Sequence, residues 1–251
     1  MADTFPDRTQ KRHSAAGIAI FCGLMVTLTG ALIALGIWQV ERLAWKRDLI
    51  ARVDARVHAE PVGAPAQAEW GKVNRADDEY RRVTVKGTLD NGRETLVYAS
   101  TTLGPGYWVV TPLRRTDDTV VLVNRGFVPT DRRDPSTRID GQVSTPVVVT
   151  GLLRIAEPKG TLLRSNDPAN DRWYSRDVAA IADRRGIDGV APYFIDADAT
   201  PNPGGLPVGG LTQVAFPNNH LVYAITWFAL ALMPAGLLVF VLRGERRARK
   251  A

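Results

Sequence analysis

The sequence has few of the residues that form disulfides and metal sites. It contains one cysteine, Cys22, and three histidines among 251 residues. A single cysteine excludes an intramolecular disulfide, and because Cys22 lies near the N-terminus, the region after it has no thiolate for a metal site. His13 lies near the N-terminus and His58 ends an amphipathic stretch, which argues against a multi-histidine metal centre. We therefore expect packing to stabilise the fold.

The common catalytic motifs are also missing. The sequence contains no H-E-x-x-H, C-x-x-C, G-x-S-x-G or S-x-x-K pattern, and no Walker or dinucleotide-binding glycine loop. The Asp and Glu residues of the central region are scattered among arginines, as is typical of solvated faces. The residues therefore predict a protein that is not an enzyme.

Long uncharged stretches, in contrast, are present near both ends of the chain. Residues 14–40 and 221–242 carry no charged side chain. A hydrocarbon core about 30 Å thick needs roughly 20 apolar helical residues, so the sequence predicts transmembrane helices at 15–40 and 218–242. For the first stretch a cleaved signal peptide is the alternative, although the run is long for a signal sequence and no A-x-A cleavage site ends it.

The net charge of +6 lies mostly in the two tails. Five of the last nine residues are Lys or Arg, which is typical of positive-inside anchoring rather than of a nucleic-acid groove. Basic residues after the first stretch outnumber those before it, which alone would place the N-terminus outside. The second stretch is less ambiguous, so we expect cytoplasmic tails at 1–14 and 243–251 and an extracytoplasmic domain at 41–217. A bacterial inner membrane with a periplasmic domain is expected, and a mitochondrial inner membrane is the alternative.

The region between the two stretches predicts a β-rich domain with a helical extension. Apolar residues keep helical spacing through residues 41–58, and prolines follow. Residues 80–89 alternate as a strand does, and a D-N-G turn after them predicts a hairpin that returns at 95–100. The fold class is thus an α+β membrane protein whose domain has six to eight strands. Further strands are expected at 107–114, 119–124, 143–155, 193–195 and 211–214, and a short helix capped by Gly186 is expected at 176–185.

His220 stands directly before the second stretch, where desolvating an ionisable imidazole costs free energy. Helical spacing places Tyr223 and Trp227 on the same face as His220. A stripe of small residues in the first stretch ends at Trp38 and is suited to close helix contact. If the two stripes pack together, the aromatic side chains surround His220 in one cleft. The stripes are Gly23, Thr27, Gly30, Ala34 and Trp38, and His220, Tyr223, Ala224, Trp227 and Ala231.

An imidazole nitrogen in an apolar, aromatic surrounding is a good axial ligand for haem iron. The propionates of a haem held there would point to the interface, where Arg42, Lys46, Asn218 and Asn219 lie. Either asparagine can also cap the helix. The alternative is an interfacial histidine that only snorkels or caps, within an ordinary aromatic belt. Residue spacing leaves both interpretations open.

Five segments of the chain form recognisable motifs: GIWQVERLAWK (36–46), YRRVTVKGTL (80–89), GYWVVTPLRR (106–115), VLVNRGFVP (121–129) and PNNHLVYAITWFALA (217–231). In order and over nearly the whole chain, they resemble segments of the Surfeit-locus-1 family. The N-R-G-aromatic-V-P segment and the N-N-H-L start of the last stretch are the most specific. Phe127 stands where the family often has Trp, so a large aromatic side chain is retained.

This resemblance implies a membrane-anchored assembly factor for cytochrome c oxidase. Such a factor would bind haem a as transient cargo and assist its insertion into haem–copper oxidase subunit I. His220 occupies the position of the axial iron ligand, with Tyr223, Trp227, Trp38 and Asn219 as its expected neighbours. The implied partners are haem a, oxidase subunit I, a haem a synthase and membrane lipid, but no nucleic acid.

Two other functions remain open from the sequence. A membrane-tethered scaffold could dock oxidase subunits without binding haem. An exported enzyme would need a polar pocket with perturbed carboxylates, and no motif points to one. Arg125 and Gly126 match a family motif, and we interpret both structurally: the glycine permits a tight backbone and the arginine makes surface hydrogen bonds.

Overall fold

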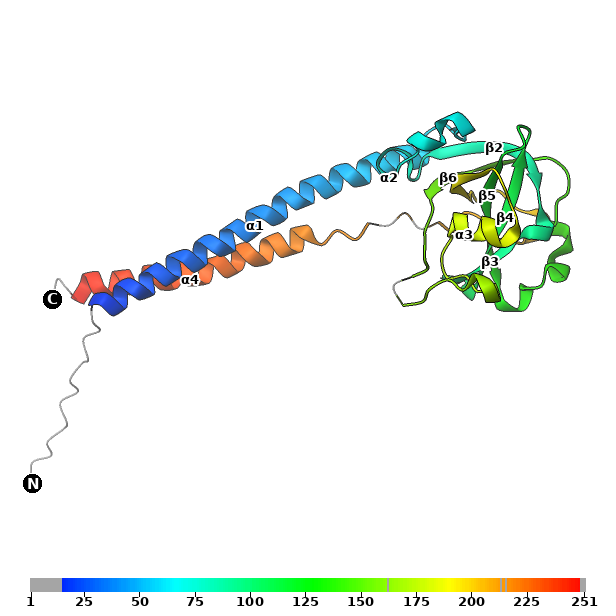
Figure 1. Cartoon of the computed structure of the whole chain (residues 1–251). Coiled ribbons are helices and arrows are strands. Elements are labelled where there is room, and N and C mark those ends of the chain that lie inside the picture. Colours follow the sequence, from blue (N-terminus) through cyan, green and yellow to red (C-terminus); the bar gives the residue numbers. More distant parts are fainter. Residues whose placement is uncertain (1–14, 162, 213, 215, 249–251) are drawn as a thin grey trace, which may run out of the picture. The chain divides into compact units, whose positions relative to one another are not determined.

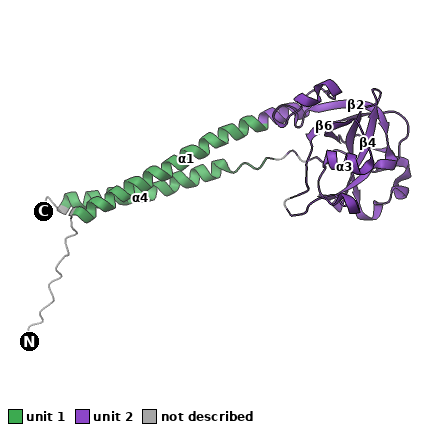
Figure 2. Ribbon diagram, viewed as in Figure 1, with its two compact units in different colours: residues 1–50, 216–251 green, residues 51–215 purple. Residues whose placement is uncertain are grey.

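The chain forms two compact units, residues 1–50 with 216–251 and residues 51–215 (Figure 2). The computed structural model describes residues 15–161, 163–212, 214 and 216–248. The expected tail at 1–14 and the last three residues of the expected basic tail therefore lie outside the described residues.

Each end of the described chain is one long helix (Figure 1). α1 spans Ala15–His58 and α4 spans His220–Ala248. Both helices are long and apolar enough to cross a membrane. α1 continues without a break from the apolar stretch into the charged extension, and it ends at the predicted residue, three positions before Pro61.

Within the first unit, α1 and α4 lie side by side and antiparallel (Figure 1). The less exposed positions of each helix recur at alternating intervals of three and four residues, the spacing of a left-handed coiled coil. The helices approach closely at Gly36, where a Cβ atom would lie 2.6 Å from the ring of Phe228. The seam consists of Met25, Thr29, Leu32, Gly36, Gln39 and Leu43 on α1, and of His220, Ala224, Trp227, Ala231 and Pro234 on α4.

The small-residue stripe predicted for the first stretch does not make this contact. A Cβ atom on Gly23 or Gly30 would have no neighbour within 4 Å, and Trp38 is 53% exposed. The prediction followed small side chains, whereas the helices meet along an adjacent heptad stripe that contains one glycine, Gly36. A regular apolar repeat thus outweighs residue size in choosing the contact face.

The second unit is a β-rich domain with seven strands among its described residues. Their order in the sheet is β1-β2-β6-β7-β5-β4-β3, and an additional β2–β4 pairing closes five of them into a ring. β5 and β7 pair in parallel, and the other pairs of the ring are antiparallel. A five-stranded Greek-key ring of this kind resembles the OB-fold. The strands are β1 (Val62–Gly63), β2 (Arg82–Leu89), β3 (Thr95–Thr101), β4 (Gly104–Arg115), β5 (Val120–Pro129), β6 (Val147–Ile155) and β7 (Val190–Ala197).

Side chains alternate between two cores along the strands of the ring. On β7, Tyr193 and Ile195 join one buried cluster, whereas Phe194 joins a second cluster with residues of α3 (Val178–Arg185). α3 begins at Asp177, whose side chain accepts a hydrogen bond from the Ala180 N–H, and ends at Gly186 with φ +61°, which confirms the predicted short helix and its cap. Buried clusters on both sides of the strands thus supply the packing on which a domain without disulfides relies.

The hairpin predicted after residue 89 is wrong. β2 and β3 both form, but β2 pairs with β6 and β4, and β3 pairs with β4. The connecting segment is a 3₁₀ turn at Asn91–Arg93, and the Asn91 side chain donates to the Val143 carbonyl over 2.8 Å. Closure of the ring thus overrides the local turn signal. The strand expected at 211–214 is also wrong at residues 211, 212 and 214, which are irregular.

The remaining regular elements are short and connect the strands. They are α2 (Arg75–Asp78) and the 3₁₀ helices at Gln67–Lys72, Thr130–Arg132, Pro135–Gly141, Pro168–Asn170 and Pro203–Gly205.

Gly126 provides a test of the packing around β5. Its φ is +130°, and a Cβ atom there would lie 2.1 Å from the Val208 carbonyl oxygen. We expect Gly126→Ala to cost more than the roughly 1–3 kcal/mol of a strained φ alone, because backbone cannot move as a flexible side chain can. Gly104→Ala is the matched control, since Gly104 has φ +98° but open space. Thermal unfolding of the detergent-purified chain should show the larger loss for Gly126→Ala, and equal losses would contradict the close approach.

Candidate functional site

His220 makes a hydrogen bond across the seam to the first helix. Its Nδ1 lies 2.7 Å from Oε1 of Gln39, which is only 9% exposed. An amide oxygen can only accept, so the ring donates from Nδ1 and Nε2 is left unprotonated in the neutral imidazole. A second residue that fixes the tautomer in this way is typical of histidines that bind metals. The site therefore presents one oriented nitrogen lone pair.

The predicted aromatic neighbours of His220 are placed differently from one another. Trp227 lies on the same seam as His220 and is half-buried. Tyr223 and Trp38 lie off the seam and are each 53% exposed. The structure thus brings His220 and Trp227 to the helix contact, but it does not close Tyr223 and Trp38 over them. Tyr223 and Trp38 therefore present exposed ring surface and do not form the walls of a closed pocket.

The two asparagines before α4 differ in their hydrogen bonding. The Asn219 carbonyl accepts from the Tyr223 N–H over 3.2 Å, as in a helical turn. The Asn218 side-chain oxygen is buried and has no hydrogen-bond partner among the described residues, so it does not cap the helix. A buried acceptor without a partner costs about 1–3 kcal/mol. The side-chain oxygen of Asn218, two residues before His220, therefore lacks a hydrogen-bond donor.

Basic side chains lie at the same end of the seam. Lys46 Nζ is 5.2 Å from the ring centre of Phe216, and the guanidinium of Arg42 is 4.1 Å from the ring of Trp45. Neither cation has a carboxylate partner within the described part of the chain. One imidazole nitrogen, exposed aromatic rings and free cations are a donor set that fits a haem with acidic propionates.

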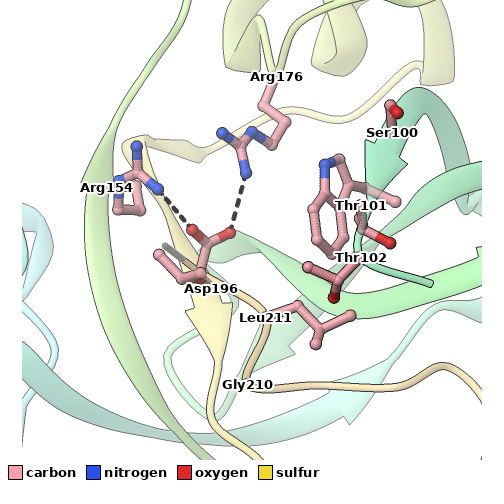
Figure 3. Close-up of a pocket in the computed structure, with 10 residues that line it drawn as sticks. Ser100, Thr101, Thr102, Arg154, Arg176, Asp196, Gly210 and Leu211 are labelled. Atoms are coloured by element: carbon pink, nitrogen blue, oxygen red, sulfur yellow. Dashed lines mark hydrogen bonds and ion pairs between the residues drawn. The ribbon is translucent and has the colours of Figure 1, made fainter. Parts of the chain in front are cut away.

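The second unit holds a polar cavity of about 440 Å³, whose floor is a buried ion-pair network (Figure 3). Asp196 is 2% exposed and accepts from Arg154 over 2.7 Å and from Arg176 over 3.3 Å. Glu79 binds Arg154 over 2.8 Å, and Glu157 binds Arg176 over 2.6 Å. Both guanidinium groups are thus held by carboxylates of the chain itself.

Burial by itself lowers the pKa of Arg154, but the charge of Asp196 and the hydrogen bond to Glu79 outweigh it and raise that pKa above its usual range. Arg154 therefore stays protonated and serves as a fixed counter-charge for Asp196. Three carboxylates face two arginines in this network, so the cavity has no surplus positive charge for an anion. We interpret the network as structural.

Residues 124–127 explain the N-R-G-aromatic segment of β5. The Asn124 side chain donates to Asp196 over 2.7 Å, and its oxygen accepts from the Gly126 N–H over 3.2 Å. Gly126 allows the close approach to Val208, and Phe127 exchanges two backbone hydrogen bonds of 2.9 Å with Val208. The segment therefore joins the ion-pair network to the loop that follows β7.

Arg125 is structural, but the expectation of surface hydrogen bonds is wrong. It is 3% exposed and donates to the side chains of Asn91 and Asn202 and to the Gly141 carbonyl. Burial lowers the pKa of Arg125, which the nearby charge of Glu94 opposes. Arg125 thereby connects β5 to three segments that are distant in the sequence, those that contain Asn91, Gly141 and Asn202.

Sequence reasoning missed Gln39 and the buried carboxylates. Gln39 is the only amide side chain in residues 14–40, and that isolation was the available signal. The carboxylates were expected on solvated faces, yet Glu79 and Asp196 are 5% and 2% exposed, and the side chain of Glu94 is 8% exposed. Nothing in their local sequence indicates burial, because the arginine partners Arg138 and Arg154 lie 42 to 75 positions away along the chain.

Comparison with known proteins matches most of the chain to one family and to proteins from several organisms. The model of the SURF1 family matches residues 26–232. Surfeit locus protein 1 of Rattus norvegicus is 39% identical over 78% of this chain and 67% of its own length, and that of Homo sapiens is 37% identical over 78% and 69%. A SURF1-like protein of Monosiga brevicollis is 36% identical over 86% of both chains.

Asp196→Asn tests whether the ion-pair network stabilises the second unit. The substitution removes one charge and leaves Arg154 and Arg176, whose side chains are 13% and 15% exposed, without their shared partner. We expect a loss of about 3–5 kcal/mol in the free energy of unfolding. Asp131→Asn is the control, because the Asp131–Arg132 pair is 78% and 50% exposed, and it should cost no more than about 0.5 kcal/mol. Denaturant unfolding of both variants measures these free energies. An Asp196→Asn protein as stable as the wild type would refute the structural role of the network.

Proposed function

Because the chain belongs to the SURF1 family, we propose that it is a membrane-anchored assembly factor for cytochrome c oxidase rather than an enzyme. In this proposal it holds haem a at the N-terminal end of α4, with His220 as the axial iron ligand. It then assists insertion of that haem into the haem–copper subunit. The haem is cargo and leaves the protein.

The observation that carries this proposal is the bond between His220 and Gln39. This bond orients the ring and keeps Nε2 available for a ligand. A histidine that only snorkels to the interface or caps the helix would not need such a bond. Trp38 and Tyr223 supply exposed aromatic surface near the ring, and Asn218 supplies an acceptor without a partner. Lys46 and Arg42 supply positive charge for propionates.

A cargo site must also release what it binds. A single imidazole ligand in an open aromatic surrounding binds iron less firmly than two axial ligands within a closed pocket. The outward exposure of Tyr223 and Trp38 supports exchange with a partner in the bilayer. The chain's own residues would hold and orient the haem, and the receiving subunit would supply further ligands.

The two long apolar helices support membrane anchoring. We propose that both termini are cytoplasmic and that the second unit lies on the opposite side, in the periplasm of a bacterium. The alternative is a mitochondrial inner membrane, which the eukaryotic sources of the relatives favour.

His220→Ala and Gln39→Leu test the haem site directly. Each variant would be purified after co-expression with the haem a synthesis pathway, and visible spectra would be compared with wild type. We expect His220→Ala to lose the bound haem a spectrum. Gln39→Leu should bind haem about 10–100-fold more weakly, as for other residues that orient a metal-binding histidine.

Thr226→Val is the matched control on α4. Thr226 is exposed and donates only to the Val222 carbonyl of its own helix, so its removal should leave the spectrum unchanged. A wild-type protein that carries no haem a when haem a is abundant would favour the alternative function, a scaffold that docks oxidase subunits without haem. Equal spectra for His220→Ala and wild type would exclude His220 as the ligand.

A further inference from the structure

Three tyrosines and two arginines form a continuous row on the surface of the second unit. Tyr98 on β3 and Tyr107 on β4 are directly paired across the two strands, with ring centres 5.8 Å apart. The Tyr98 N–H donates to the Trp173 carbonyl, which brings Tyr174 beside Tyr98 at 6.3 Å. Arg133 lies 5.3 Å from the Tyr107 ring and Arg164 lies 5.4 Å from the Tyr174 ring. The row therefore has an arginine at each end.

The polar groups of this row are not used by the fold. Arg133 and Arg164 are exposed, and neither has a carboxylate partner among the described residues. The three phenol hydroxyls likewise have no hydrogen-bond partner in the described chain. In contrast, Arg154 and Arg176 in the polar cavity of the same unit are fully committed to carboxylates.

Tyr and Arg are the side chains that most often dominate the binding energy of protein interfaces. Stacking on the tyrosine rings holds the guanidinium groups flat against the surface, so less entropy is lost when they bind. Such a row offers five hydrogen-bonding groups, of which two carry positive charge. Its complement is a protein segment with carboxylate side chains. A lipid surface would gain only about 1 kcal/mol from each of two cations, which is too little for stable attachment.

We propose that this row, Arg164–Tyr174–Tyr98–Tyr107–Arg133, is the docking face for an acidic segment of a partner protein. The proposal rests on the function proposed above in taking that partner from among the oxidase subunits that receive the haem. The tyrosine hydroxyls and guanidinium groups donate to the partner's carboxylates, and the tyrosine rings contact its apolar atoms.

A photo-crosslinking amino acid in place of Tyr98 in the full-length chain tests the proposal in cells that assemble the oxidase. The crosslinked peptide would be identified by mass spectrometry, with the same crosslinker at Thr88, an exposed position on β2, as the reference site. We expect a net negatively charged segment of an oxidase subunit to be captured from position 98 and not from position 88. Capture of lipid, of a second copy of this chain, or of a neutral or basic segment would overturn the proposal, as would no capture above the reference.

Charge reversal provides the second measurement. Arg133→Glu with Arg164→Glu should lower the yield of the crosslinked product about tenfold or more, because like charges would then face each other. Lys72→Glu with Lys86→Glu makes the same charge change at exposed positions away from the row and should leave the yield unchanged. Equal yields from the two double variants would overturn the proposal.

The haem a spectrum separates this proposal from the function on which it rests. Arg133→Glu with Arg164→Glu should keep the wild-type spectrum, since His220 lies in the other unit. A wild type without haem a that still captures an acidic oxidase segment would remove the haem assignment and support the docking face. Normal haem a binding without capture of an acidic oxidase segment would support the haem assignment and overturn the docking face.

Discussion

Where two helices meet along apolar side chains, a polar side chain in the contact finds its hydrogen-bond partner in another polar side chain of the same contact. Gln39 and His220 are such a pair, and their bond sets both the register of α1 against α4 and the tautomer of the imidazole. A shift of either helix by one turn would break this bond and leave an amide and an imidazole unpaired at an otherwise apolar helix contact. The same bond therefore stabilises the helix pair and determines which nitrogen is presented to a ligand.

In the second unit, several buried and half-buried polar groups are ionised side chains that pair with one another. Arg154 and Arg176 are neutralised by Asp196 on β7 and by Glu79 and Glu157 outside the strands, so this network leaves no surplus positive charge for a ligand. Arg125 instead donates to neutral acceptors, the side chains of Asn91 and Asn202 and the Gly141 carbonyl. Exposed groups remain free for recognition, among them the row of Arg164, Tyr174, Tyr98, Tyr107 and Arg133.

The long helices, the strand-rich centre and the candidate histidine could be predicted because each has a local signal: an uncharged run, an alternation, or an ionisable residue at the end of an apolar stretch. The contact face of α1 could not, since Gly23, Gly30 and Gly36 are equally small and only the position of the partner helix distinguishes them. The partners of β2 depend on closure of the ring, which no turn residue encodes. The buried state of Asp196 depends on arginines 20 and 42 positions away along the chain.

Ring closure also determines which strand edges remain open. β1 is two residues long, and part of the outer side of β3 is covered at Val97, where Trp173 bridges it. The second unit contains no cysteine, since Cys22 lies in α1. This domain can therefore reach its folded state without an oxidant or a thiol exchange partner, because it has no thiol that could form a disulfide.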